Sequence, residues 1–390
     1  MLPVIVVAVI VARFPTLRRR RRGLRPRLIW GPIPIISIKY WSQALRAQGF
    51  TSRTCVFGYY AINQRSDFDF HYDDFLPAGL LFEPFRAYLV FLWVLCVSDV
   101  YFSFFDGGFL QVTALRRIEL PLLRLAGKRI VASPYGSDIA VPGHLDVAEE
   151  PLLRDYPEIA VYGMRTRRRV LSFARWANLI VRNYQYGFLP RWDVLWPTQL
   201  AIDVAQWRPA QPLGDANGHV GEVVVVHAPN HRHIKGTQRL IEAIDHLCSE
   251  GLRVRLELLE RRPNSEVRTA VLQADIVVEQ LIAGYAMFAI EGMSAGRPVL
   301  SALSWLPDDV RADLKRRGLP IVDANVDTVT EELRALIEDP QRRRGLGEAG
   351  RRFVLDHHSY HAVGAVWEVI IQHVWGGEAL PMGLSQRHGC

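Results

Sequence analysis

The sequence is poor in cysteine, and this scarcity limits the chemistry that the protein can perform. Its 390 residues include four cysteines, which are scattered and form no C-x-x-C pair. Disulfide frameworks and structural zinc sites are built from closely spaced cysteines. The sequence therefore predicts a reducing, cytoplasmic environment and no metal centre.

The chain also lacks an excess of positive charge beyond its first 27 residues. Eight of its 47 Lys and Arg residues lie in residues 1–27, which contain no acidic residue. The remaining 39 basic residues face 40 acidic ones, so residues 28–390 are nearly neutral although the whole chain carries +7. Nucleic-acid-binding proteins present extended basic surfaces, so we expect no nucleic acid among the partners.

Residues 1–27 form an Arg-rich N-terminal extension that begins with 12 uncharged residues. A helix of 12 residues rises about 18 Å, which is short of a hydrocarbon core of about 30 Å. No basic residue precedes it, as one does in a secretory signal. Three interpretations stay open: a start codon placed too far upstream, a shallow anchor at the inner membrane surface, or a signal anchor.

From residue 28 the chain alternates between short aliphatic runs and helical patterns. Residues 28–30 and 52–57 have the composition of buried strands. The residues between them predict a helix that Ser37 caps and Gly49 ends. The apolar stretch over residues 82–105 predicts a helix and then a buried strand. This strand–helix–strand order is typical of an open α/β domain.

A segment rich in Pro, Gly, Asn and Asp separates two halves of similar character. The strands of the second half are almost wholly aliphatic, which indicates a parallel sheet covered on both faces. We predict an N-terminal extension over 1–27, an N-terminal domain over 28–209, a linker over 210–218, a C-terminal domain over 219–355, and a C-terminal helix and tail over 356–390.

A loop in the second half, between a strand and a helix, carries two cations, Arg232 and Lys235. In open α/β sheets ligands bind at the carboxyl ends of strands. Helix N-termini bind anions through free N–H groups and a partial positive charge. The arrangement suits a diphosphate. The alternative is a solvated loop whose cations face water.

A second candidate element is the helix that follows a glycine-containing turn near residue 284. Glu291 lies one turn inside this helix. Its carboxylate can accept two hydrogen bonds from hydroxyl groups, as the two hydroxyls of a ribose would supply. The alternative is a helix residue that faces solvent or is stabilised by the helix dipole.

Residues 223–299 resemble the donor-binding half of the glycosyl transferases group 1 family, retaining enzymes of the GT-B fold. That family shows a basic pair ending in Lys-Gly, then Glu, seven residues, Glu and Ala-Met-Ala-x-Gly-x-Pro-Val. The residues that match here are Lys235, Gly236, Glu291, Met293, Gly296, Pro298 and Val299. The resemblance implies an α/β protein with two Rossmann-like domains facing across a cleft, and a nucleotide held by the C-terminal one.

The resemblance also implies roles for particular residues. Arg232 and Lys235 would bind the diphosphate of the donor, and Glu291 its ribose. Backbone N–H groups near the phosphates or the sugar would come from Gly284, Tyr285 and Ala286.

Two positions depart from the family pattern. Ala283 stands where the first glutamate of the family lies, and Glu279, four residues earlier, would replace it as a contact to the donor sugar. The partner cation precedes Lys235 by three positions, whereas many relatives have it five positions before, where this chain has Asn230.

The N-terminal half resembles the family more weakly. Tyr135-Gly-Ser-Asp138 stands where relatives carry His-Gly-x-Asp near the donor sugar, and the alternative is a turn with a helix cap. Gly31 opens the loop and helix that line the acceptor cleft in relatives. Residues 196–209 resemble the family's hinge, and a helix near 363–375 is expected to cross back to the first domain.

The resemblance implies transfer of a sugar, with retention and without metal or cofactor, from a nucleotide-diphosphate sugar to a saccharide or lipid-linked acceptor. The sequence identifies no catalytic nucleophile. Two alternatives stay open. One is a sugar-nucleotide epimerase of the same fold. The other is an inactive partner subunit, because Ala283 and Tyr135 depart from the family pattern.

Overall fold

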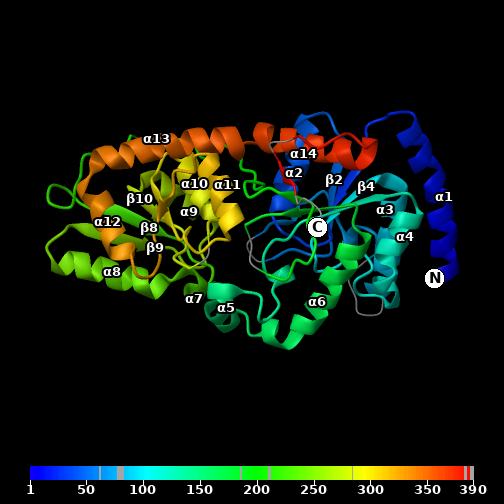
Figure 1. Cartoon of the computed structure of the whole chain (residues 1–390), viewed down its shortest axis with the longest axis horizontal. Coiled ribbons are helices and arrows are strands. Elements are labelled where there is room, and N and C mark those ends of the chain that lie inside the picture. The colour runs from blue at the N-terminus through cyan, green and yellow to red at the C-terminus, as the bar shows by residue number, and fades with distance from the viewer. Residues whose placement is uncertain are drawn as a thin grey trace. The chain divides into compact units, whose positions relative to one another are not determined.

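A computed structural model describes residues 1–60, 63–76, 83–184, 187–209, 212–282, 284–381 and 384–386. The chain forms two compact α/β units (Figure 1). Unit 1 consists of Met1–Val141, Tyr162–Trp196 and the chain from Val363 onward; unit 2 consists of Pro142–Val161 and Pro197–Ala362. The first unit thus includes the N-terminal extension, and the second includes two segments that sequence analysis placed in the N-terminal domain.

Unit 1 is built on a sheet of eight strands in the order β13-β7-β6-β5-β4-β1-β2-β3. All neighbouring strands are parallel except β13, which is antiparallel to β7. The strands are β1 (Leu28–Trp30), β2 (Ser52–Val56), β3 (Phe70–His71), β4 (Val100–Ser103), β5 (Arg129–Ala132), β6 (Leu179–Arg182), β7 (Val194–Leu195) and β13 (Ser385–Gln386). The predicted strands of the first half are confirmed.

Six longer helices accompany this sheet among the described residues. They are α1 (Leu2–Arg21), α2 (Ser37–Ala47), α3 (Glu83–Val97), α4 (Glu119–Leu125), α6 (Glu158–Trp176) and α14 (Tyr360–Gly376). The cap predicted for α2 is wrong, because Ser37 is its first helical residue and the preceding Ile36 is the N-cap. Gly49 follows the end of α2 with a φ of +83°, which fits the predicted stop.

A cluster of large aromatic side chains joins α14 to the sheet of unit 1. The Trp367 ring lies 5.3 Å from the rings of Trp30, Phe102 and Trp196, and 5.4 Å from that of Trp41. Trp30 and Phe102 stack at 3.8 Å. The helix expected near residues 363–375 is therefore present, and its aromatic side chain completes the core of the first unit.

The N-terminal helix α1 packs against α3 and α4 (Figure 1). One stripe of it is buried, and its members are Ile5, Val9, Ala12 and Thr16. The buried Lys128 ammonium donates a hydrogen bond to Thr16 Oγ1 at 2.8 Å. Within the described part of the chain, no helix has the length and apolar character that crossing a membrane requires.

Unit 2 has a sheet of five parallel strands in the order β12-β11-β10-β8-β9. Four consecutive valines begin β8, and such β-branched residues suit the interior of a parallel sheet. The strands are β8 (Val223–His227), β9 (Val254–Leu258), β10 (Ile276–Val278), β11 (Val299–Ser301) and β12 (Val322–Asp323).

Helices accompany the sheet of unit 2. They are α5 (Glu149–Asp155), α7 (Arg232–Lys235), α8 (Thr237–Ser249), α9 (Asn264–Gln273), α10 (Met287–Ser294), α11 (Asp308–Arg316), α12 (Val329–Glu338) and α13 (Pro340–His357). The mixed polar and apolar residues over 149–175 predict a helix, and the structure divides this stretch into α5 and α6, because Pro157 lies between them.

The aromatic cluster makes Trp367 a sensitive position for the stability of unit 1. Trp367→Ala removes a fully buried ring, and such substitutions lower the free energy of unfolding by about 3–5 kcal/mol. Urea unfolding followed by amide hydrogen exchange in unit 1 measures this loss. Phe85→Ala is the control, because that side chain is 53% exposed and its loss should cost less than about 0.5 kcal/mol. Equal losses would mean that Trp367 does not anchor α14.

Candidate functional site

The candidate residues of unit 2 follow the carboxyl ends of two neighbouring parallel strands, β8 and β10. After β8 the chain forms the single helical turn α7, which ends at Lys235. Gly236 then adopts a left-handed conformation with φ of +69°, and a Cβ at this position would lie 2.9 Å from Cβ of Leu281. Only glycine adopts the left-handed conformation readily and also leaves this space to Leu281. Gly236 therefore allows the chain that carries Lys235 to lie close to the residues after β10.

Lys235 and Glu279 form a nearly buried ion pair at this edge of the sheet. The Lys235 ammonium donates to Glu279 Oε1, and the side chains are 11% and 0% exposed. The other oxygen, Oε2, accepts the backbone N–H of Ala289 at 2.7 Å, in the first turn of α10. One lysine and one helix N-terminus thus bind the same carboxylate. These groups are also suited to an oxygen of a phosphate.

Glu291 lies on α10 close to this pair, and its side chain is buried. Burial raises the pKa of Glu291 to about 8, and the charge of Glu279 adds to the increase. A hydrogen bond with Asn264 and the charge of Lys235 oppose that rise in pKa. The structure therefore brings three predicted residues together and adds Asn264, the first residue of α9, which no sequence motif indicates.

The turn before α10 contains Gly284, Tyr285 and Ala286, whose backbone N–H groups the resemblance assigns to the donor. Gly284 has a φ of +61°, but its N–H donates to the carbonyl of Ala302 at 2.9 Å and so is not available to a ligand in this structure. Ala286 is the N-cap of α10, and the buried Tyr285 ring lies 6.1 Å from that of His358. Ala283 lies outside the described residues.

The Arg232 side chain is paired with Glu260, and no contact is seen between it and the side chains of Lys235, Glu279 and Glu291 among the described residues. Its guanidinium group makes two hydrogen bonds to the Glu260 carboxylate, at 2.7 and 2.9 Å. This hydrogen-bonded pair raises the pKa of Arg232 and lowers that of Glu260. Asp155 of α5 accepts from the backbone N–H of Ile234 at 2.8 Å, so a carboxylate already occupies the start of α7. No motif in the sequence indicates Glu260 or Asp155 as a partner.

In unit 1, Asp138 holds two loops together. Its carboxylate is fully buried and accepts the backbone N–H groups of Phe105, Tyr135 and Gly136, each at 3.0 Å. Burial, with the nearby charge of Asp106, raises the pKa of Asp138 to about 7. These contacts fit the interpretation of Asp138 as a residue that organises its turn, and they leave its carboxylate no exposed surface for a ligand.

Tyr135 and Gly31 complete the predicted set in unit 1. The Tyr135 hydroxyl donates to the Asp106 carboxylate, and burial raises the pKa of Tyr135 well above its usual value. Gly31 follows β1 with a φ of +147°, and a Cβ there would lie 2.0 Å from the carbonyl oxygen of Cys55. Glycine is required where this loop passes β2.

Within the ranges that the structure describes, no group of three His, Cys, Asp or Glu side chains is arranged to hold a metal ion. His227, at the end of β8, is fully buried. Its ring nitrogens lie 2.8 Å from the carbonyl of Val278 and 3.0 Å from the Thr237 hydroxyl. Burial lowers the pKa of His227 to about 4. Its two contacts connect the end of β8 with β10 and α8.

The pKa of Glu291 predicts how stability depends on pH. Because this pKa rises from its ordinary 4.5 to about 8 on folding, the folded state binds the proton more tightly than the unfolded state. Stability should therefore fall as pH rises from about 5 to 8, by up to about 1.4 kcal/mol per pH unit. Urea unfolding of unit 2 at several pH values should show a smaller slope for Glu291→Gln. An unchanged slope would contradict the raised pKa.

This architecture also occurs in known proteins. No family model matches the chain. Over 243 residues it is 23% identical to an MMP alpha-(1→4)-mannosyltransferase from Mycolicibacterium hassiacum, and the match covers 55% of this chain and 57% of that relative. The chain thus spans little more than half the length of this relative.

Two of the solved structures that resemble this chain align with 90% of it. A sucrose-phosphate synthase from Thermosynechococcus elongatus aligns with a TM-score of 0.55 at 13% identity, covering 90% of this chain and 100% of that one. The Anabaena protein HepE, solved in complex with UDP-glucose, gives a TM-score of 0.54 at 12% identity and the same coverage. The chain therefore has the GT-B fold, and its donor-side motif resembles that of the glycosyl transferases group 1 family.

Proposed function

We propose that this protein is a glycosyltransferase that moves a sugar from a nucleotide-diphosphate sugar to a saccharide or lipid-linked acceptor. The observation that carries the proposal is the Lys235–Glu279 pair at the N-terminus of α10, with Glu291 buried beside it. The GT-B fold and the named relatives, a mannosyltransferase and a structure holding UDP-glucose, support the same reaction class.

In this proposal each buried group binds a different part of the donor. Lys235 and the first turn of α10, which begins after Ala286, bind the diphosphate. Glu291 accepts the ribose hydroxyls, and Glu279, which lies between Lys235 and α10, contacts the sugar in place of the family's missing glutamate. Tyr135 is the proposed sugar contact from unit 1, and Asp138 positions it.

The departing nucleoside diphosphate gains negative charge as the bond to the sugar breaks. A preorganised cation and a helix N-terminus stabilise such charge without reorganising. Lys235 and α10 supply both, so we propose that the transfer is independent of a metal ion. Retention of configuration is proposed from the family resemblance, and no residue is assigned as a nucleophile.

Arg232 can join the diphosphate site only if it leaves Glu260. This exchange is inexpensive, because both side chains are exposed, at 47% and 38%, and exposed ion pairs contribute little to stability. A diphosphate carries more charge than one carboxylate and competes for the guanidinium group. We propose that Arg232 turns from Glu260 to the donor when the donor binds.

The donor site is tested by a thermal-shift screen of nucleotide sugars, followed by titration of the matching nucleotide diphosphate. Loss of a charge-assisted hydrogen bond costs about 1.5–3 kcal/mol, so Lys235→Ala should weaken binding about 10- to 100-fold. Arg239→Ala is the control, because this exposed residue of α8 pairs with Glu242. Unchanged affinity in folded Lys235→Ala protein would refute the site.

A second assay separates transfer from epimerisation. A transferase releases nucleotide diphosphate only when acceptor is present.

We also propose that α1 holds the protein at an anionic membrane surface. Its inner stripe is buried against unit 1, whereas Val7, Val11 and Phe14 on the opposite face are 60%, 62% and 70% exposed. Exposed arginines, Arg18 and Arg21 among them, continue this face. An apolar face beside basic residues is the pattern of a helix that lies in a membrane interface.

Point substitutions test this attachment better than truncation does, because removing α1 would expose the core beneath it. Val7→Asp with Val11→Asp should lower flotation with vesicles rich in phosphatidylglycerol at least tenfold, since two apolar contacts are lost and two acids added. Val161→Asp with Val220→Asp is the matched control at valines that are 73% and 72% exposed. Equal flotation of both double variants would show that α1 is not the anchor.

A further inference from the structure

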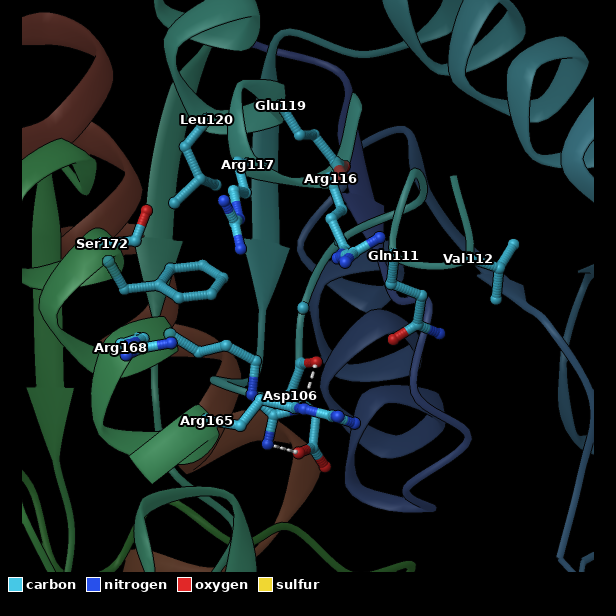
Figure 2. Close-up of a pocket in the computed structure, with 14 residues that line it drawn as sticks. Asp106, Gln111, Val112, Arg116, Arg117, Glu119, Leu120, Arg165, Arg168 and Ser172 are labelled. Atoms are coloured by element: carbon cyan, nitrogen blue, oxygen red, sulfur yellow. Dashed lines mark hydrogen bonds and ion pairs between the residues drawn. The ribbon is translucent and has the colours of Figure 1, made fainter. Parts of the chain in front are cut away.

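Unit 1 contains a cavity of about 810 Å³ between α6 and the chain that follows β4. Figure 2 shows its wall, on which arginine side chains predominate. Two come from the short 3-10 turn η3 (Ala114–Arg117) before α4, and three come from α6 on the other side of the cavity. These five residues are Arg116, Arg117, Arg165, Arg168 and Arg169. The volume lies in the range of small-molecule sites.

The two acidic residues of the wall, Asp106 and Glu119, neutralise little of this charge. Asp106 pairs with Arg169 at 2.9 Å. Glu119 is turned toward the backbone, where it accepts the N–H groups of Phe109 at 2.6 Å and Leu110 at 2.8 Å. Burial raises the pKa of Glu119 to about 7, so its negative charge is partly lost near neutral pH.

Four arginines of the cavity therefore keep their charge uncompensated. Among the residues that the structure describes, no acidic side chain forms an ion pair with Arg116, Arg117, Arg165 or Arg168. Arg116 donates to the carbonyl of Thr113 at 3.2 Å, and the Arg165 guanidinium lies 5.0 Å from the Tyr162 ring centre. These contacts orient the side chains without neutralising them.

The arrangement is selective for anions with more than one charge. A concave wall of one sign focuses its potential and concentrates ions of the opposite sign. Planar guanidinium groups match phosphate oxygens with paired hydrogen bonds. A single carboxylate would leave three of the four charges unpaired, whereas a phosphate monoester or a diphosphate brings about two negative charges.

The cavity also has contacts for a part of the ligand that is not ionic. Leu120 and Phe173 line it beside the arginines, which suits the face of a sugar or an alkyl chain. Asp106, on its wall, accepts the hydroxyl hydrogen of Tyr135, the proposed contact to the donor sugar. One side chain thus connects the cavity with the place in unit 1 where we expect the reacting sugar.

We propose that this cavity binds the phosphate or diphosphate group of the acceptor. The proposal rests on the proposed function and deepens it, because it assigns the acceptor to the class of phosphate-bearing saccharides. Arg165 and Arg168 hold the anionic group from α6, and Arg116 and Arg117 hold it from η3.

Titration of the full chain with inorganic pyrophosphate tests the site. All proteins carry Lys235→Ala, which removes the proposed donor diphosphate site from the measurement. Arg165→Gln with Arg168→Gln should weaken pyrophosphate binding at least tenfold, since two charge-assisted contacts are lost. The control is Arg167→Gln with Arg175→Gln on the same helix, whose guanidinium groups lie over the rings of Phe188 and Trp176.

The other wall provides an independent variant, Arg116→Gln with Arg117→Gln, which should weaken binding similarly. Binding that is equal in all three double variants, or absent from the Lys235→Ala protein itself, overturns the proposal. The donor site is tested separately, by the effect of Lys235→Ala on the binding of nucleotide diphosphate.

A second titration distinguishes an acceptor from a free anion. Hexose phosphates are compared with inorganic phosphate and with the unmodified hexoses. We expect at least one hexose phosphate to bind tenfold tighter than either, and the advantage to disappear in Arg165→Gln with Arg168→Gln. If inorganic phosphate binds as tightly as every hexose phosphate, the cavity is a site for free phosphate and the acceptor assignment is wrong.

Discussion

The parallel direction of the strands is the constraint on which the candidate sites depend. Parallel strands end at the same edge of a sheet, so the loops that follow them gather side chains from distant parts of the chain. Gly31 follows β1, Tyr135 follows β5, Lys235 follows β8 and Glu279 follows β10. The sheets are stabilised by aliphatic and aromatic burial, and this leaves the loops free to carry polar groups whose positions the sheet has already fixed.

Buried carboxylates make these loops rigid. Asp138, Glu119 and Glu279 each lose hydration on folding, and each recovers hydrogen bonds from backbone N–H groups of a neighbouring segment. Removing such a carboxylate would leave buried N–H groups without an acceptor, which costs more than the hydrogen bonds contribute when intact. Glu279 differs because a lysine also binds it, and it is this pair that we propose the donor contacts.

Much of the fold could be predicted from the sequence, and the reasons are local. Aliphatic runs such as Val223–His227 are stable only when they are buried in a sheet. Lys235 and Glu291 belong to a motif with characteristic spacing, so their proximity could be expected. Pairing across the chain could not be predicted in the same way. Glu260 pairs with Arg232 across 28 residues, and no pattern in the sequence links them. The composition of residues 1–27 differs from that of the rest of the chain and therefore predicts a separate extension. The buried stripe of α1 is nevertheless part of unit 1.

The distribution of charge over the folded protein is the property that the sequence predicts least well. Residues 28–390 are nearly neutral when their charges are counted, but neutrality of a chain says nothing about neutrality of a surface. The run Arg165–Arg169 contains four arginines, and the turn of the helix directs three of them toward one cavity while Arg167 packs against Phe188. Acidic residues that balance them in the count lie elsewhere, many in pairs of their own. A reaction that joins two phosphate-bearing substrates would need two separate cationic sites, and a nearly neutral protein can hold both only by segregating its charge.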